Sequence, residues 1–165
     1  MSTAFLFPGQ GSQKVVMGKD LVETSVSAKK RYEEANEIMG MDLAKLSFAG
    51  PEETLRKTEV TQPALFVVSI VLAELAMAGG LKPSFSAGHS LGEYSALVAA
   101  EVLDFESGLR LVKKRGALMH AAGDKKPGAM AAIMDLDDQA VVDLCQGSSG
   151  TVVAANFNAP GQLVI

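Results

Sequence analysis

The sequence predicts an α/β fold in which a parallel sheet carries a serine on a sharp strand-to-helix turn. Residues Thr3–Phe7 (TAFLF) form a short apolar run closed by Pro-Gly, which is typical of a buried parallel strand. A second β-type run, Pro83–Ala87, leads into the pentapeptide Gly88–Gly92 (GHSLG), and a helix-prone run, Glu93–Ala100, follows it. Strands that alternate with helices in this way build parallel sheets with helices on their faces.

The pentapeptide has the form Gly-x-Ser-x-Gly, with Ser90 at its centre. In a nucleophile elbow the serine projects from the top of the sheet, and the glycines keep the tight turn free of Cβ clashes. The first N–H groups of the next helix then face a developing oxyanion. A turn in which Ser90 only caps the helix fits the same letters, so the pentapeptide alone leaves both interpretations open.

The composition indicates a globular domain. The 165 residues, 48% hydrophobic and 21% charged, suffice for a sizeable core, and the net charge of -4 argues against a nucleic-acid binder. The apolar segment Pro63–Leu81 is interrupted by Ser69 and Glu74, so we interpret it as a buried helix rather than a membrane span. No signal peptide or metal-ligand spacing of Cys and His is visible. The single cysteine, Cys145, predicts a buried thiol in a reducing compartment.

A glycine-rich loop, Gly9–Gln13 (GQGSQ), follows the first strand. A P-loop requires Gly-Lys-Ser/Thr after its second glycine, and Gly11 is followed by Ser-Gln. A dinucleotide-binding fingerprint requires a third glycine where Lys14 stands. Both nucleotide-binding interpretations fail. A flexible loop with two amide side chains remains, at the carboxyl end of a strand, where open α/β sheets place their ligands.

Helices are predicted between and after the two strands. Gly50–Glu53 marks a turn with a helix start, because proline suits the first helical position. Thr61 and Pro63 are predicted as N-cap and first turn of the long apolar helix. Asp104 is the predicted N-cap of a helix over Phe105–Ala122. The remaining helices are predicted over residues 20–39, in two pieces, and 42–48.

The helix over Phe105–Ala122 has two distinct sides. One side is basic and solvated, with Arg110, Lys113, Lys114 and Ala117; the other is an apolar flank with Leu111, Arg115, Leu118 and Met119. If this helix returns antiparallel to the elbow helix, each of them covers about 15 Å, so Arg115 comes back to the level of Ser90. A guanidinium there could clamp a carboxylate through two hydrogen bonds, although an arginine whose stem covers apolar surface has the same phase.

A polar break at Asp124–Gly128 (DKKPG) predicts a domain boundary, with residues 1–125 in a large domain and 126–165 in a smaller one. The smaller part is predicted as a strand, a helix and two strands, as in a split βαβ unit. These elements are Ala129–Met134, Asp137–Cys145, Thr151–Ala155 and Gln162–Ile165. Because the sequence stops inside this last apolar run, we expect a truncated chain.

A serine nucleophile requires a base within hydrogen-bond reach. His89 adjoins Ser90, but the sharp turn directs its side chain away, so we interpret it as a loop-supporting group. His120 lies one turn beyond Arg115, and we interpret it as a partly exposed histidine at a helix end. Either the base lies outside this sequence or Ser90 is not a nucleophile.

Five ordered segments resemble the malonyl-CoA:acyl carrier protein transacylases and, more broadly, the acyltransferase domains of fatty acid and polyketide synthases. They are FLFPGQGSQ (Phe5–Gln13), VTQPAL (Val60–Leu65), GHSLGEYSAL (Gly88–Leu97), the KRGALM segment around Arg115, and NFNAPGQLVI (Asn156–Ile165). The resemblance implies an α/β-hydrolase-like large domain with an inserted ferredoxin-like subdomain, both incomplete in this chain.

The resemblance also implies residue roles. Ser90 would accept the acyl group, and the N–H of Leu91 would form the oxyanion hole beside the loop residue Gln10. Arg115 would bind the malonyl carboxylate. The base would be a histidine after a later strand, beyond residue 165. The other substrate-side residues would be Gln62, His89, which supports the elbow, and Met119.

The implied reaction transfers a malonyl group from malonyl-CoA to the phosphopantetheine thiol of acyl carrier protein, through an acyl-serine, for fatty acid biosynthesis. Coenzyme A enters as a thioester substrate, and no metal or redox cofactor is implied. We expect a monomer, cytoplasmic or in a plastid after loss of a transit peptide, without nucleic-acid or membrane partners. A basic patch at Lys113 and Lys114 would help to dock the acidic acyl carrier protein.

Two other functions remain as alternatives: an α/β-hydrolase-type serine esterase, and a non-catalytic fragment of a split acyltransferase. Without the base, we predict that residues 1–165 alone lack robust activity. Because their sheet would lack strands and expose apolar surface, we also predict that they are unstable alone.

Overall fold

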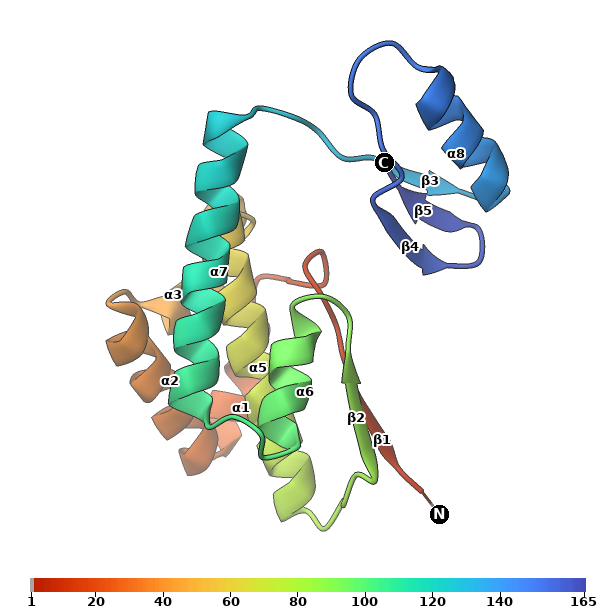
Figure 1. Cartoon of the computed structure of the whole chain (residues 1–165). Helices are drawn as coiled ribbons and strands as arrows, with labels where there is room; N and C mark the ends of the chain where they lie inside the picture. The colour runs from red at the N-terminus through yellow and green to blue at the C-terminus, as the bar shows by residue number, and fades with distance from the viewer. Residues whose placement is uncertain (1) are drawn as a thin grey trace. The chain divides into compact units, whose positions relative to one another are not determined.

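The computed structural model describes residues 2–165, which form two compact units, one up to Asp124 and one over Lys125–Ile165 (Figure 1). The first unit is an α/β structure in which two strands and six helices surround one long helix, α5. Its elements are β1 (Ala4–Phe7), α1 (Lys19–Thr24), α2 (Val26–Met39), α3 (Leu43–Ala49), α4 (Glu52–Leu55), α5 (Thr58–Ala78), β2 (Phe85–Gly88), α6 (Gly92–Ala99) and α7 (Phe105–Lys125).

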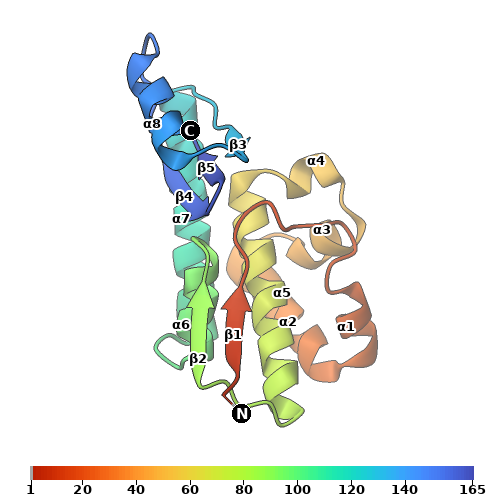
Figure 2. The same ribbon diagram turned by 90° about the vertical axis from the view of Figure 1, so that its right-hand side faces the viewer.

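The two strands of the first unit pair in parallel, as predicted, with Ala4 opposite Phe85 and Phe7 opposite Gly88. Figure 2 shows them side by side and pointing the same way. One face of the pair packs on the helices, because Phe7 forms a small core with Ala73 of α5 and Ala96 of α6. The prediction of a buried strand over Thr3–Phe7 is wrong, since Leu6 is exposed; Phe85 of β2 is exposed too.

Helix α5 is the central core element of the first unit. Every residue from Val60 to Val71 is buried, and the largest core side chains pack around the helix. By length and composition alone α5 could cross a membrane, but 72% of its most apolar window is buried within the protein. It therefore has the surroundings of a core helix, as the interruptions at Ser69 and Glu74 predicted.

The start of α5 differs from the prediction. The helix begins at Thr58 with Lys57 as N-cap, so Thr61 is not the cap and Pro63 lies inside the helix rather than in its first turn. The Thr61 hydroxyl instead donates to the carbonyl of Leu55, which ties α5 to α4. A proline is tolerated here because it lies close to the N-terminus, where few helical hydrogen bonds are lost.

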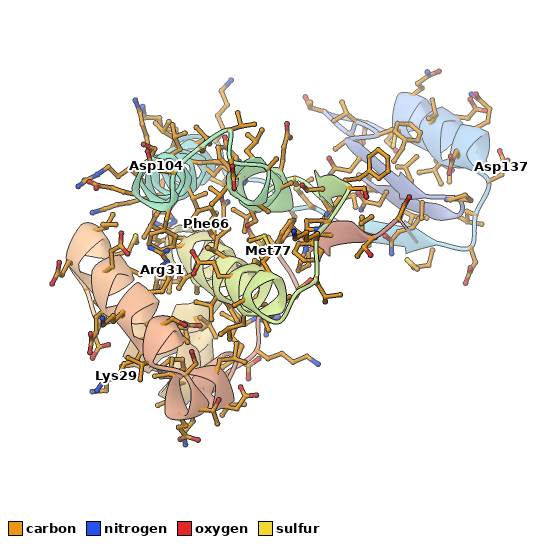
Figure 3. The ribbon with its side chains drawn as sticks, turned by 90° about the horizontal axis from the view of Figure 1, so that it is seen from below. Lys29, Arg31, Phe66, Met77, Asp104 and Asp137 are labelled. Carbon is orange, nitrogen blue, oxygen red and sulfur yellow. The ribbon has the colours of Figure 1, made fainter. Side chains whose placement is uncertain are left out.

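Besides the apolar core, a charged side chain links the helical layer before α5 to that helix. Arg31 of α2 donates to Glu34 and to both carboxylate oxygens of Glu74 on α5, and its guanidinium lies 4.3 Å from the centre of the Phe105 ring. Figure 3 shows Arg31 between α2 and α5. Arg31 is half-buried. Its hydrogen bonds to the Glu74 carboxylate and its contact with the Phe105 ring join α2 to α5 and α7.

Helix α7 begins after Asp104, whose carboxylate accepts a hydrogen bond from the Ser107 N–H at 2.6 Å, so the predicted N-cap is confirmed. The buried stripe is not the predicted one. Leu111, Leu118 and Met119 are exposed. The buried residues are Phe105, Gly108, Leu109, Val112 and Gly116. Two glycines belong to this stripe because α5 approaches α7 closely, and a hydrophobicity pattern does not detect glycine.

The second unit contains β3 (Ala132–Met134), α8 (Asp138–Gly147), β4 (Asn156–Ala159) and β5 (Gln162–Val164). Its strands form an antiparallel sheet in the order β3-β5-β4. The strand predicted over Thr151–Ala155 is wrong, because the hairpin partner of β5 is Asn156–Ala159. Cys145 is buried with Val141 and Leu163, so the prediction of a buried thiol is confirmed.

Candidate active site

The turn between β2 and α6 has the geometry of a nucleophile elbow. Ser90 has a φ of 53°, which is uncommon for a residue with a side chain, and strain of this kind concentrates at functional sites. A Cβ on Gly88 would lie 1.9 Å from the carbonyl carbon of Gly92, and a Cβ on Gly92 would lie 2.2 Å from the Phe7 oxygen. Only glycine fits at both positions, because strand, turn and helix are in backbone contact.

The alternative in which Ser90 caps the helix does not hold. The N-cap of α6 is Leu91, and no side chain caps this helix. The Ser90 side chain is engaged elsewhere: its Oγ accepts a hydrogen bond from Nη2 of Arg115 at 2.9 Å. The serine is thus exposed at the turn and directed toward a cation.

Arg115 reaches Ser90 because α7 returns beside α6, as the helix lengths predicted. Besides its bond to Ser90, Arg115 donates from Nη1 to Oε1 of Gln62 at 2.6 Å, and its guanidinium carbon lies 5.9 Å from the Tyr94 ring centre. The bond to Gln62 fixes the plane of the guanidinium. A planar, half-buried guanidinium next to a serine is suited to hold a carboxylate on the serine's reaction partner.

Gln62 connects Arg115 to the glycine-rich loop. This side chain is completely buried near the N-terminus of α5, and its Nε2 lies 3.3 Å from Oε1 of Gln10 and 3.1 Å from the sulfur of Met119. Gln10 in turn donates from Nε2 to the Thr58 hydroxyl at 3.2 Å. A continuous chain of contacts therefore runs from Ser90 through Arg115 and Gln62 to the loop and Thr58.

Two backbone donors border the elbow. Within residues 2–165, neither the N–H of Gln10 nor that of Leu91 donates to another backbone group. His89 supports the loop: its N–H donates to the Phe7 carbonyl at 3.0 Å, and a Cβ on Gly9 would lie 2.7 Å from its Nδ1. The predicted residues at this turn therefore come together.

No base accompanies the serine among the residues that the structure describes, since Arg115 is the only hydrogen-bond partner of the Ser90 side chain there. His120 faces other groups, with Nδ1 3.4 Å from Glu59 and Nε2 3.7 Å from Asp124. Over the same residues, no group of three or more His, Cys, Asp or Glu is arranged to hold a metal ion.

Lys113, one of the two exposed lysines of the predicted docking patch, also has a contact within the protein. Lys113 donates from Nζ to the carbonyls of Ile38 and Met39 at 2.9 and 3.0 Å, so it satisfies the C-terminus of α2. The contact joins residues 75 positions apart, and no local pattern predicts it.

Thr58 is a site neighbour that the sequence analysis did not single out. Its spacing of four residues from Gln62 was the available signal, because such pairs share one helix face.

Comparisons with known proteins agree with this geometry. The family model described as "Acyl transferase domain" matches residues 4–165. The malonyl CoA-acyl carrier protein transacylases of Bacillus subtilis and of Synechocystis are each 47% identical over 165 residues, covering 98% and 100% of this chain and 52% and 54% of their own. The chain thus spans about half the length of the curated relatives it matches.

Solved structures show the same similarity. The transacylase of Xanthomonas oryzae matches with a TM-score of 0.92 and 46% identity, over 99% of this chain and 54% of its own. A malonyl-transacylase solved in complex with a type II PKS acyl-carrier protein matches with a TM-score of 0.90 and 42% identity, over the same shares. With the family model covering nearly its whole length, this chain belongs to the acyl transferase domain family.

Proposed function

We propose that the full-length protein transfers a malonyl group from malonyl-CoA to the phosphopantetheine thiol of acyl carrier protein, through an ester on Ser90. The observation that carries this proposal is the hydrogen bond between Arg115 and Ser90 at 2.9 Å, with the guanidinium oriented by buried Gln62. A thioester carbonyl at Ser90 Oγ would leave the far carboxylate of a malonyl group within reach of Arg115. Relatives named as malonyl CoA-acyl carrier protein transacylases support the substrate and the partner.

The chemistry has two steps. In the first, Ser90 Oγ attacks the thioester carbonyl, its proton passes to a base, and the C–S bond breaks as coenzyme A takes the proton and leaves. In the second, the thiol of the carrier protein gives its proton to the base and attacks the ester carbonyl, the C–O bond to Ser90 breaks, and Ser90 recovers a proton from the base. The N–H groups of Leu91 and Gln10 would hold the oxyanion in both steps, because preorganised donors stabilise the charge that develops there. Alternate transfer through a covalent enzyme predicts ping-pong kinetics.

The base is part of the proposal. Following the family resemblance, we assign it to a histidine after a later strand, outside the part of the protein described here. Arg115 cannot fill this role, because a guanidinium stays protonated. In its resting contact with Ser90 it donates to Oγ and leaves the serine proton free for that base.

The finer fold description and the setting of the protein are also proposals. We assign the first unit to an α/β-hydrolase-like large domain and the second to a ferredoxin-like subdomain; a parallel strand pair with an elbow, and an antiparallel sheet with one helix, support these assignments. We further propose a cytoplasmic monomer that uses malonyl-CoA as substrate and needs no metal or redox cofactor.

Mass spectrometry tests this function directly. The full-length protein is incubated with malonyl-CoA, digested, and searched for a malonyl group on the Ser90 peptide. We expect the adduct on the wild type, its absence in Ser90→Ala, and its removal by added holo-acyl carrier protein. A wild type without the adduct, or an adduct that persists in Ser90→Ala, contradicts the proposal. A freely hydrolysed adduct that acyl carrier protein does not remove indicates an esterase.

A further inference from the structure

We propose that Thr58, the first residue of α5, is a positioning residue that anchors the Gln10 loop at the active site. The inference rests on the proposed function for its kinetic consequence, because Gln10 is there an oxyanion donor. The anchoring itself is a structural property and has its own test.

The side chain of Gln10 is held at both ends of its amide. Nε2 donates to Thr58 Oγ1 at 3.2 Å, and Oε1 accepts from Gln62 Nε2 at 3.3 Å. Thr58 and Gln62 are four residues apart, so they lie on one face of α5. The two helix side chains present an acceptor and a donor that match the two ends of one amide, which fixes its orientation.

Thr58 itself is firmly placed. Its backbone packs against α7 at Gly116, where a Cβ would lie 3.2 Å from the Thr58 carbonyl oxygen and 3.0 Å from the Cα of Glu59. Glycine at this position lets the two helices approach closely. The Thr58 hydroxyl is therefore a fixed point to which a loop can be attached.

The loop needs such an attachment. Gly9 and Gly11 flank Gln10, Gly11 has a φ of 107°, and Gln10 is exposed. Glycines give the chain many conformations to lose, so holding this loop in one of them costs conformational entropy. Without the bond to Thr58, the Gln10 side chain keeps, within residues 2–165, its hydrogen bond to Gln62, around which it can turn. The position of its N–H is then less well defined.

The first test measures anchoring without reference to activity. Hydrogen exchange is followed in the full-length protein at the amides of Gly11 and Ser12, which are bonded to Gln13 Oε1 and to the Gly9 carbonyl within the loop. Thr58→Val keeps the shape and removes the hydroxyl. We expect exchange about threefold to tenfold faster, the range that the loss of one hydrogen bond allows. Unchanged exchange overturns the proposal, whether or not the protein transfers malonyl groups.

The second test measures the consequence for transfer. We expect Thr58→Val to lower kcat for malonyl transfer about threefold to tenfold, with KM for malonyl-CoA little changed, since an oxyanion donor acts mainly in the transition state. Thr58→Ser, which keeps the hydroxyl, should restore kcat. Thr54→Val on α4 makes the same substitution four residues away and should change neither parameter. If wild type transfers malonyl and Thr58→Val matches it in kcat, the positioning role is wrong and the proposed function stands.

Discussion

Two fully buried polar side chains in the first unit have opposite surroundings. Gln62, at the site end of α5, uses its amide to contact Arg115, Gln10 and Met119. Tyr32, in the core beside α5, has a hydroxyl with no hydrogen-bond partner within residues 2–165. Its ring packs against Phe48 with centroids 4.9 Å apart, and its oxygen would lie 2.3 Å from a Cβ on Gly18.

This difference separates polar groups that serve the site from those that serve the core. An unpaired buried hydroxyl costs free energy, so Tyr32 is stabilised by its ring and not by its oxygen. Gln62 buries a whole amide, which is acceptable only because its partners satisfy it. Removing the polar atoms of Gln62 should therefore reduce activity. Removing the hydroxyl of Tyr32 should leave stability intact.

The largest effect is expected from Arg115→Ala, which removes the cation that contacts Ser90 and Gln62. Hydrogen bonds to charged groups are worth about 1.5–3 kcal/mol, so the preference for malonyl-CoA over acetyl-CoA should fall about 10- to 150-fold. Transfer rates with both thioesters, measured on full-length protein, check this. An esterase that does not use the acyl carboxylate would show equal rates before and after the substitution.

Gln62→Leu is expected to have the next largest effect, since it leaves Arg115 in place but removes the acceptor that orients it. The kcat/KM for malonyl-CoA should fall about 5- to 30-fold, or ~1–2 kcal/mol, with a smaller change for acetyl-CoA. Gln139→Leu, at an exposed position on α8, is the matched control and should leave both values unchanged. An equal loss for both thioesters would show that Gln62 supports the fold rather than Arg115.

The sequence predicted much of the candidate active site around Ser90. The pentapeptide left an elbow and a helix cap open, and the helix lengths placed Arg115 at the level of Ser90 only if the second helix returned antiparallel. The family resemblance favoured the elbow and the carboxylate-binding role of Arg115. These predictions depend on the spacing of residues that are close in sequence, which the sequence gives directly. Gln62 was assigned through the family resemblance, and its role as the link to the loop needed the structure.

Features set by distant partners were not predicted. Lys113 bonds to carbonyls at the end of α2, and Asn156–Ala159 is a strand because β5 pairs with it. The buried stripe of α7 was misplaced because Gly108 and Gly116 occupy positions where α5 comes close. The unpaired hydroxyl of Tyr32 depends on packing from several elements, and no pattern within α2 reveals it.

A smaller effect, on stability rather than activity, is expected from Tyr32→Phe. Removing the unpaired hydroxyl should change the free energy of unfolding by about 0 to +1 kcal/mol. Burial, and to a lesser extent the charge of Asp20, raises the pKa of Tyr32. An unfolded tyrosine ionises near pH 10, so the stability linked to Tyr32 is complete below about pH 10 and is lost as the pH rises above it.

Denaturant unfolding of the full-length protein from pH 8 to 11 measures both effects. Tyr32→Phe should lose less stability at alkaline pH than wild type. A loss of more than ~1 kcal/mol near neutral pH would mean that the Tyr32 hydroxyl has a hydrogen-bond partner in solution.

The smallest effect, on stability, is expected from Asp104→Asn. Asp104 is an exposed polar group with hydrogen-bond partners, unlike the buried Gln62 and Tyr32. The backbone N–H of Ser107, and then its hydroxyl, hold the pKa of Asp104 below its usual value. A lowered pKa means that the cap contributes fully above the unfolded value of about 3.9 and that this contribution is lost as the pH falls through the folded value. Asp104→Asn keeps a capping oxygen without the charge, so its unfolding midpoint should lie slightly below that of wild type at pH 7 and approach it in acid. A constant difference at every pH would show that the charge of Asp104 contributes nothing to the start of α7.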